Sequence, residues 1–364
     1  MKIAFYGSSL VSSYWNGAAT YYRGLLRALA ACGHDITFYE PDILDRQRHR
    51  DIAPPGWCNV VVYQPTDAGL RNVVNDAALA DVVVKASGVG FADDALIAMT
   101  MTAARPDALR IWWDVDAPAT LAEIRGEASH PLRSALPKLD LVLTYGGGDP
   151  VVTAYRELGA PDCVPIYNAL DPVTHHPVAP DQRYASDLAF LGNRLPDREA
   201  RVETFLLRPA ERLPSHRFLL GGAGWHNRHC PPNVLRIGHV GTETHNAFNA
   251  TPRAILNINR ASMAAMGYSP PTRLFEVAGA GACLITDAWE GIEMFLSPGS
   301  EVLVARDGGD IVDIMQTLTA EQAAAIGRAG RQRILAEHTY DRRAALLHAL
   351  LERTLADRRE VVAT

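Results

Sequence analysis

The sequence of 364 residues lacks several patterns that mark particular classes of protein. Its five cysteines are odd in number, widely spaced and without any Cys-x-x-Cys pair, which argues against a disulfide framework and favours a reducing compartment. Apolar runs stay short of the ~18 residues that a membrane-spanning helix needs. The opening residues lack a signal-peptide pattern. We therefore expect a cytoplasmic protein, with peripheral association with a membrane left open.

Lysine is nearly absent, since only Lys2, Lys85 and Lys138 occur. The second half of the chain therefore contains no Gly-x-x-x-x-Gly-Lys loop, which argues against an ATPase. A phosphate-binding cation in that half must be arginine, whose planar guanidinium bonds two phosphate oxygens at once. The net charge of −6 provides no positive field for a polyanion, so nucleic acid is not an expected partner.

Other motifs are incomplete. Gly88-Val89-Gly90 and Gly279-Ala280-Gly281 lack the third glycine of the dinucleotide-binding fingerprint, so an NAD-dependent enzyme is a minor alternative. A Gly-x-Ser-x-Gly hydrolase motif is missing. The stretch His226–Cys230 offers two imidazoles and a thiol without a second ligand pair, and His175-His176 lies in a proline-rich segment. We therefore predict no metal site.

Strand and helix patterns alternate along the whole chain, which predicts an α/β fold with parallel sheets covered by helices. At ~150 residues per domain, the length suggests two domains. Each is predicted to be Rossmann-like and doubly wound, and such domains facing one another would enclose a cleft. The strands are expected near residues 2–6, 36–39, 58–63, 81–85, 109–114, 139–144, 162–166, 187–191, 216–220, 234–237, 254–258, 282–286 and 301–304.

The domain boundary is predicted from composition. Residues 169–181 contain three prolines and no periodicity, which is typical of a linker. We therefore expect an N-terminal domain over 1–168 and a C-terminal domain over 182–338. A final helical segment, 339–364, is expected to pack back toward the first domain.

The second half contains a candidate anion site. A strand ends near Asn259 and Arg260, a Gly/Pro loop follows, and a short helix is predicted to begin near Pro271-Thr272. The N-terminus of that helix would stabilise an anion, and Glu276, one turn further, can accept hydrogen bonds from sugar hydroxyls. The alternative is an ordinary helix start with surface arginines.

A second polar cluster, Phe190–Arg198, follows the first strand of the same half. Gly192 permits close approach of a ligand to the backbone, and Arg194 and Arg198 are placed to reach a phosphate.

These segments resemble the GT-B glycosyltransferases, and within them the spore-maturation-like (CgeB-type) proteins related to glycosyltransferase family 4. The resemblance is strongest over residues 187–345 and weaker over the opening and 112–118. It implies that the C-terminal domain binds a nucleoside-diphosphate sugar of UDP or GDP type and the N-terminal domain an acceptor. It also implies sugar transfer without a metal or a further cofactor.

The resemblance assigns roles to individual residues. Glu276 would hold the ribose, and Arg194 and Arg198 the diphosphate. Family-4 enzymes usually carry another glutamate eight residues earlier, where this chain has Tyr268. That departure leaves a retaining mechanism open and makes an inactive nucleotide-sugar-binding protein the main alternative. The expected donor site comprises Gly192, Arg194, Arg198, Arg260, Ser269, Thr272, Arg273 and Glu276.

The catalytic candidates are Asp114, Asp116 and Glu290. The two aspartates end a predicted strand of the first domain, and either would serve as general base if the reaction inverts. Asp116 alternatively caps the next helix. Glu290 is expected near the donor sugar, whereas Trp15, Asn16 and Gly17 are expected to shape the acceptor side.

Overall fold

The structure, a computed structural model, describes residues 1–14 and 16–363, which fold into two compact units. The first unit combines Met1–Tyr167 with the C-terminal segment from Tyr340, and the second is Asn168–Thr339. Residues 169–181, expected to be a linker, are instead part of the second unit. The Leu170 amide donates a hydrogen bond to the His338 carbonyl at 2.8 Å, which fixes the segment to that unit.

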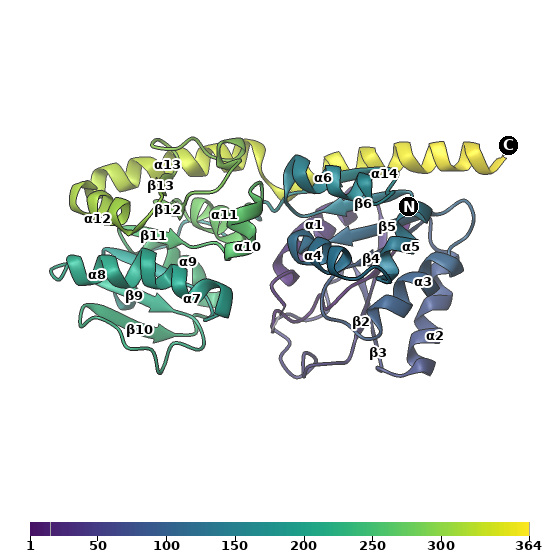
Figure 1. Cartoon of the computed structure of the whole chain (residues 1–364), viewed down its shortest axis with the longest axis horizontal. Coiled ribbons are helices and arrows are strands. Elements are labelled where there is room, and N and C mark those ends of the chain that lie inside the picture. Colours follow the sequence, from purple (N-terminus) through teal and green to yellow (C-terminus); the bar gives the residue numbers. More distant parts are fainter. Residues whose placement is uncertain (15, 364) are drawn as a thin grey trace. The chain divides into compact units, whose positions relative to one another are not determined.

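The first unit is built on a parallel sheet with strand order β3-β2-β1-β4-β5-β6-β7 (Figure 1). Near-continuous apolar runs form these strands because helices cover both faces of the sheet. The strands are β1 (Lys2–Tyr6), β2 (Asp35–Pro41), β3 (Asn59–Tyr63), β4 (Val82–Ala86), β5 (Leu109–Asp114), β6 (Leu141–Thr144) and β7 (Cys163–Pro165). Each matches a strand expected from the sequence to within a few residues.

The helices of the first unit include one from the far end of the chain. They are α1 (Ala19–Ala31), α2 (Asp67–Asn75), α3 (Asp93–Ala103), α4 (Ala117–Gly126), α5 (Pro131–Ala135), α6 (Gly148–Glu157) and α14 (Tyr340–Ala363). Helix α14, yellow in Figure 1, belongs to this unit and packs on α1. Gly24 allows this contact, since a Cβ there would lie 2.2 Å from the Tyr340 ring.

The second unit contains another parallel sheet, with order β10-β9-β8-β11-β12-β13. Its strands are β8 (Leu188–Leu191), β9 (Phe218–Gly221), β10 (Val234–Gly238), β11 (Ala254–Asn257), β12 (Leu284–Asp287) and β13 (Leu303–Ala305). Its helices are α7 (Pro196–Val202), α8 (Arg208–Arg212), α9 (Thr242–Ala250), α10 (Ala261–Met266), α11 (Thr272–Gly279), α12 (Gly308–Thr317) and α13 (Ala320–Glu337). A π-helical turn, Glu203–Leu207, joins α7 to α8.

Both sheets reverse their strand order after the first strand of the unit. The reversal lies between β1 and β4 in the first unit and between β8 and β11 in the second. Ligands of doubly wound folds bind beyond the carboxyl ends of the strands at such a reversal. These two sheet edges are therefore where functional residues are sought. Among the described residues, no helix is both long enough and apolar enough to span a bilayer.

Candidate functional site

Helix α11 begins at the strand reversal of the second unit. Its N-cap is Pro271, and no side chain of the described residues caps its first turn. The Thr272 hydroxyl accepts a hydrogen bond from the Asn168 side chain at 2.8 Å, and Ser269 is buried in the preceding loop. Uncapped N–H groups and the helix dipole together favour an anion at this end. The predicted helix start is confirmed.

Glu276 lies one turn into α11 and is only 9% exposed. Its nearest charged or ionisable neighbours are His175 Nε2 at 4.0 Å, His245 Nε2 at 3.9 Å and Arg273 Nε at 3.9 Å. Burial acts to raise the pKa of Glu276, but His245, Arg273 and His175 lower it, so the net pKa lies below the ordinary value. The carboxylate is therefore ionised, with its neighbours beyond hydrogen-bond distance.

Arginine side chains gather beside Gly192, which follows β8. A Cβ on Gly192 would lie 3.0 Å from Arg198 Nη1, so the missing side chain makes room for this guanidinium. Burial lowers the pKa of Arg198, Asp197 opposes that change, and the positive charges of Arg273 and Arg260 lower the pKa further. Arg198 Nε is buried without a hydrogen-bond partner among the described residues. This cationic cluster suits an anionic ligand.

The other members of the cluster have protein partners. Arg273 donates to the Leu191 carbonyl at 3.1 Å, and Arg260 pairs with Asp197 at 2.7 Å. These bonds hold the two guanidinium groups, whose positive charges act on Arg198.

Arg194, the other arginine predicted to reach the phosphate, is engaged elsewhere. Its guanidinium bonds both carboxylate oxygens of Glu199 at 2.6 and 3.0 Å and the Asn227 side-chain oxygen at 2.9 Å. Because its planar fork is occupied, the geometry favours Arg198 over Arg194 as a phosphate ligand.

Tyr268 and Glu290 form a pair near the start of α11. The Tyr268 hydroxyl donates to Glu290 Oε1 at 2.8 Å, and the Tyr268 amide donates to the Glu290 carbonyl at 2.6 Å. Gly291 is required here, because a Cβ on it would lie 2.4 Å from the Tyr268 ring. The structure thus places an exposed carboxylate, Glu290, beside Tyr268.

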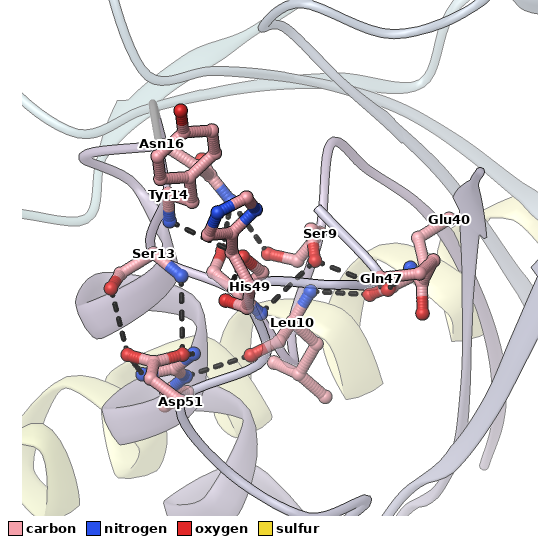
Figure 2. Close-up of polar contacts among 11 residues, drawn as sticks. Ser9, Leu10, Ser13, Tyr14, Asn16, Glu40, Gln47, His49 and Asp51 are labelled. Carbon is pink, nitrogen blue, oxygen red and sulfur yellow. Dashed lines mark hydrogen bonds and ion pairs between the residues drawn. The ribbon is translucent and has the colours of Figure 1, made fainter. Parts of the chain in front are cut away.

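The loop after β1 is fixed at the strand reversal of the first unit. Figure 2 shows Ser9, Leu10 and Gln47 directed at the fully buried carboxylate of Glu40. The Ser9 hydroxyl, the Leu10 amide and the Gln47 side chain donate to it at 3.1, 2.6 and 2.6 Å. Asn16 is buried and donates to the Ser9 carbonyl at 2.8 Å. The carboxylate and the amide therefore hold the backbone of this loop.

The remaining members of the predicted acceptor-side group differ from Asn16. Gly17 is exposed, and a Cβ there would meet open space, so close packing does not require glycine at this position. Trp15 lies outside the described residues. Tyr14, stacked on His49 with ring centroids 4.0 Å apart (Figure 2), is an exposed aromatic residue of the same loop that sequence reasoning missed.

Asp114 and Asp116 lie at the end of β5 in different environments. Asp114 is fully buried and accepts hydrogen bonds from the hydroxyls of Tyr155, Ser87 and Thr120 and from the Asp116 amide. Burial raises the pKa of Asp114, and these donors lower it in part. Such a carboxyl cannot reach an acceptor, which argues against Asp114 as the base. Asp116 is half-buried at the N-cap of α4, and its side chain does not cap the helix.

Of the two histidines beside Glu276, the sequence analysis named His175 but predicted no metal site there, and it did not single out His245. His175 comes from the segment expected to be a linker, and His245 from α9, so no short motif joins them to Glu276. Within the described residues, His175, His245 and Glu276 form the one group of metal-ligand side chains, their ligand atoms lying within 4.8 Å of one another. The stretch His226–Cys230 forms no such group.

Comparison with known proteins supports this picture at the level of the fold. Residues 198–349 match a family model described as glycosyl transferase-like, which spans less than half of the chain. No curated protein matches the chain by sequence.

Similar solved structures cover nearly the whole chain. Sucrose-phosphate synthase from Thermosynechococcus elongatus has a TM-score of 0.73 and 13% identity, covering 98% of this chain and all of its own. HepE from Anabaena, solved with UDP and glucose, has a TM-score of 0.68 and 14% identity, covering 97% of this chain and 99% of its own. AviGT4, a glycosyltransferase involved in avilamycin A biosynthesis, has a TM-score of 0.63 and 17% identity, covering 98% of each chain. The chain therefore has the GT-B fold of glycosyltransferases, built from two Rossmann-like units.

Proposed function

We propose that this protein is a glycosyltransferase that moves a sugar from a nucleoside-diphosphate donor to an acceptor. The match of residues 198–349 to a glycosyl transferase-like family supports this function. The fold is also that of HepE, which has been solved with UDP and with UDP-glucose, so a UDP-type donor is the first to test. Within the fold, a CgeB-type protein related to family 4 remains our assignment, on the motifs around Gly192 and Glu276.

The observation that carries the proposal is the buried carboxylate of Glu276, which accepts no hydrogen bond from the described residues. It lies one turn from the uncapped N-terminus of α11. A nucleoside diphosphate presents a vicinal diol, which donates hydrogen bonds, and a pyrophosphate, which accepts them. Glu276 is buried, ionised and without a hydrogen bond from the described residues, so it can take the diol. The start of α11 and Arg198 provide donors for the pyrophosphate.

The same groups provide chemistry for the transfer. Negative charge develops on the departing diphosphate, and the guanidinium groups of Arg198, Arg260 and Arg273 would stabilise it together with the dipole of α11. Transfer by this route needs no metal ion. In the first unit, Asp116 is the proposed general base for an inverting reaction, because its neighbour Asp114 is saturated and inaccessible. Glu290, held by Tyr268, is proposed to contact the donor sugar.

The test is nucleotide binding followed by turnover. Calorimetry with UDP, GDP, dTDP and NADH should show binding of a nucleoside diphosphate, and UDP-glucose should release UDP in the presence of an acceptor. Glu276→Ala should weaken UDP affinity by about 1–3 kcal/mol, the size of a lost charged hydrogen bond. Glu293→Ala, at an exposed glutamate of the same unit, is the matched control. Equal UDP affinity in wild type and Glu276→Ala would remove this role.

A second candidate is a nucleotide-sugar-binding protein without transferase activity. The observation in its favour is Tyr268, which replaces the glutamate that family-4 enzymes usually place at the donor sugar. Tight UDP binding without UDP release across a broad panel of acceptors would support this candidate over the enzyme.

A further inference from the structure

The group around Glu276 contains the donor atoms of a transition-metal site. Glu276 lies on α11, His245 on α9 and His175 on the segment that precedes the second sheet. The two imidazole Nε2 atoms lie 4.0 and 3.9 Å from different oxygens of the carboxylate. Two ligand atoms of a tetrahedral zinc ion are about 3.4 Å apart, so each of these two imidazole–carboxylate distances is roughly 0.5 Å too long. One ligand atom from each of the three residues can be chosen so that all three lie within 4.8 Å of one another, so side-chain adjustments would have to bring them together around an ion.

The backbone segments that carry the three side chains are packed together before any ligand binds. His175 is buried, and its amide donates to the Asp171 carbonyl at 2.9 Å. The segment is pressed against α11, because a Cβ on Gly279 would lie 2.9 Å from the His175 carbonyl oxygen. Helix α9 also packs on α11. Because the three residues lie on elements that pack against one another, their relative positions are defined, as a metal site requires.

The chemistry of the donor set also suits a metal. His175 and His245 each offer an imidazole nitrogen, and Glu276 offers a carboxylate oxygen. Imidazole nitrogens select zinc and related ions over magnesium, which prefers oxygen. The positive charge of Arg273 opposes the binding of a cation, because its Nη1 lies 3.4 Å from His245 Nε2. Its other hydrogen-bond partners are the Leu191 carbonyl at 3.1 Å and the Asn249 side-chain oxygen at 3.5 Å, so the guanidinium can stay bound while Nη1 releases the histidine.

We propose that His175, His245 and Glu276 bind a zinc ion or a similar divalent transition-metal ion, and that this ion competes with the donor nucleotide for Glu276. Metal binding is independent of the proposed function, whereas the competition rests on it. The ion is an inhibitor in this scheme: it occupies the carboxylate that would hold the ribose, and sugar transfer itself needs no metal.

The first experiment measures metal binding alone, with the full chain and no nucleotide. Calorimetric titration with ZnCl₂ should show one site per chain, and MgCl₂ should show none. His175→Ala and His245→Ala should each weaken zinc binding at least tenfold. His176→Ala changes the exposed neighbour of His175 and should leave zinc binding unchanged. Absence of zinc binding, or equal binding in wild type, His175→Ala and His245→Ala, would overturn the proposal.

A spectroscopic readout separates this site from the loop that contains Cys230. Cobalt bound to two imidazoles and a carboxylate should give visible bands without a thiolate charge-transfer band, and Cys230→Ser should leave them unchanged. A thiolate band lost in Cys230→Ser would place the metal in the loop and refute the assignment. His175→Gln, if its thermal unfolding matches wild type, repeats the zinc test in a variant shown to be folded.

The last experiment measures competition. UDP affinity should fall at least fivefold at a zinc concentration that saturates the site, and in His175→Ala it should be insensitive to the same concentration. Unchanged UDP affinity in zinc-saturated wild type would refute the competition. A chain that binds zinc but no nucleoside diphosphate would refute the proposed function and leave the metal site standing.

Discussion

Glu276 of the second unit differs from two buried carboxylates of the first unit in the hydrogen bonds that it accepts. In the first unit, Asp114 and Glu40 are fully buried, and hydroxyls, amides and a glutamine of the same unit saturate them with hydrogen bonds. In the second unit, Glu276 is nearly as buried, yet the groups around it stand 3.9–4.0 Å away. A buried carboxylate whose hydrogen bonds all come from the chain holds nearby backbone in place. A buried carboxylate without such bonds can accept them from a ligand.

The largest effect should come from Asp116, a half-buried carboxylate next to the hydrogen-bonded Asp114. Asp116→Asn should lower turnover by about 10²–10⁴-fold, the range for loss of a general base, and should leave UDP affinity unchanged. Steady-state rates and calorimetry on the same preparation check this. Wild-type turnover in Asp116→Asn would show that Asp116 is not the general base, and the first unit would then have no proposed catalytic carboxylate.

Removing the saturated carboxylate should affect stability instead. Asp114→Ala leaves the hydroxyls of Tyr155, Ser87 and Thr120 without their acceptor in a buried setting. We expect the free energy of unfolding to fall by roughly 3–5 kcal/mol, measured by urea denaturation. If the free energy of unfolding falls by less than about 1 kcal/mol, the hydrogen bonds to Asp114 do not stabilise the end of β5. The structural role that distinguishes Asp114 from Glu276 would then be refuted.

The arginines of the second unit offer a matched pair. Arg198 has an unpartnered buried Nε, whereas Arg194 is bonded to both oxygens of Glu199. Arg198→Ala should weaken UDP binding by about 1.5–3 kcal/mol, and Arg194→Ala by less than about 1 kcal/mol. Calorimetry with UDP compares them directly. The reverse order would show that Arg194 exchanges Glu199 for the phosphate when the nucleotide binds.

The smallest effect concerns pH and the C-terminal helix. His34 is buried, its Nε2 lies 2.9 Å from Nδ1 of His348 on α14, and burial lowers the pKa of His34 from 6.5 to about 4. The unfolded chain therefore takes up a proton as the pH falls below 6.5, while the folded chain resists until about 4. Stability should decline over that range. His34→Gln should show a shallower decline in Tm, and an unchanged profile would assign the decline to other groups.

The strands were the most predictable part of the fold. Runs such as Leu188–Leu191 and residues 82–84 are apolar on successive residues, a pattern typical of strands buried on both faces. The start of α11 was also predictable, because Pro271 and Thr272 follow a Gly/Pro loop. Shorter helices such as α10 (Ala261–Met266) and α5 (Pro131–Ala135) lack a clear apolar stripe and were not found.

The hydrogen-bond and ion-pair partners of the site residues could not be predicted from the sequence. Arg194 looked equivalent to Arg198 in the sequence, but Glu199 lies within reach of only one of them. His175 looked like part of a linker because its segment is rich in proline, and only the packing of that segment on α11 places its ring beside Glu276. Asp114 and Asp116 are two residues apart, and the hydroxyls that distinguish them come from β4, α4 and α6 or their adjoining loops.

The sequence by itself determined the alternation of strands and helices, the two-unit α/β architecture and the position of a helix start suited to an anion. These follow from local physics, since hydrophobic periodicity and helix starts depend on residues near one another in the chain. The tertiary structure alone decided which charged side chains form hydrogen bonds within the protein and which can still accept or donate them to a ligand. That outcome depends on contacts between residues far apart in the chain, such as His175 and Glu276 or His34 and His348, which only the packed fold brings within a few ångströms.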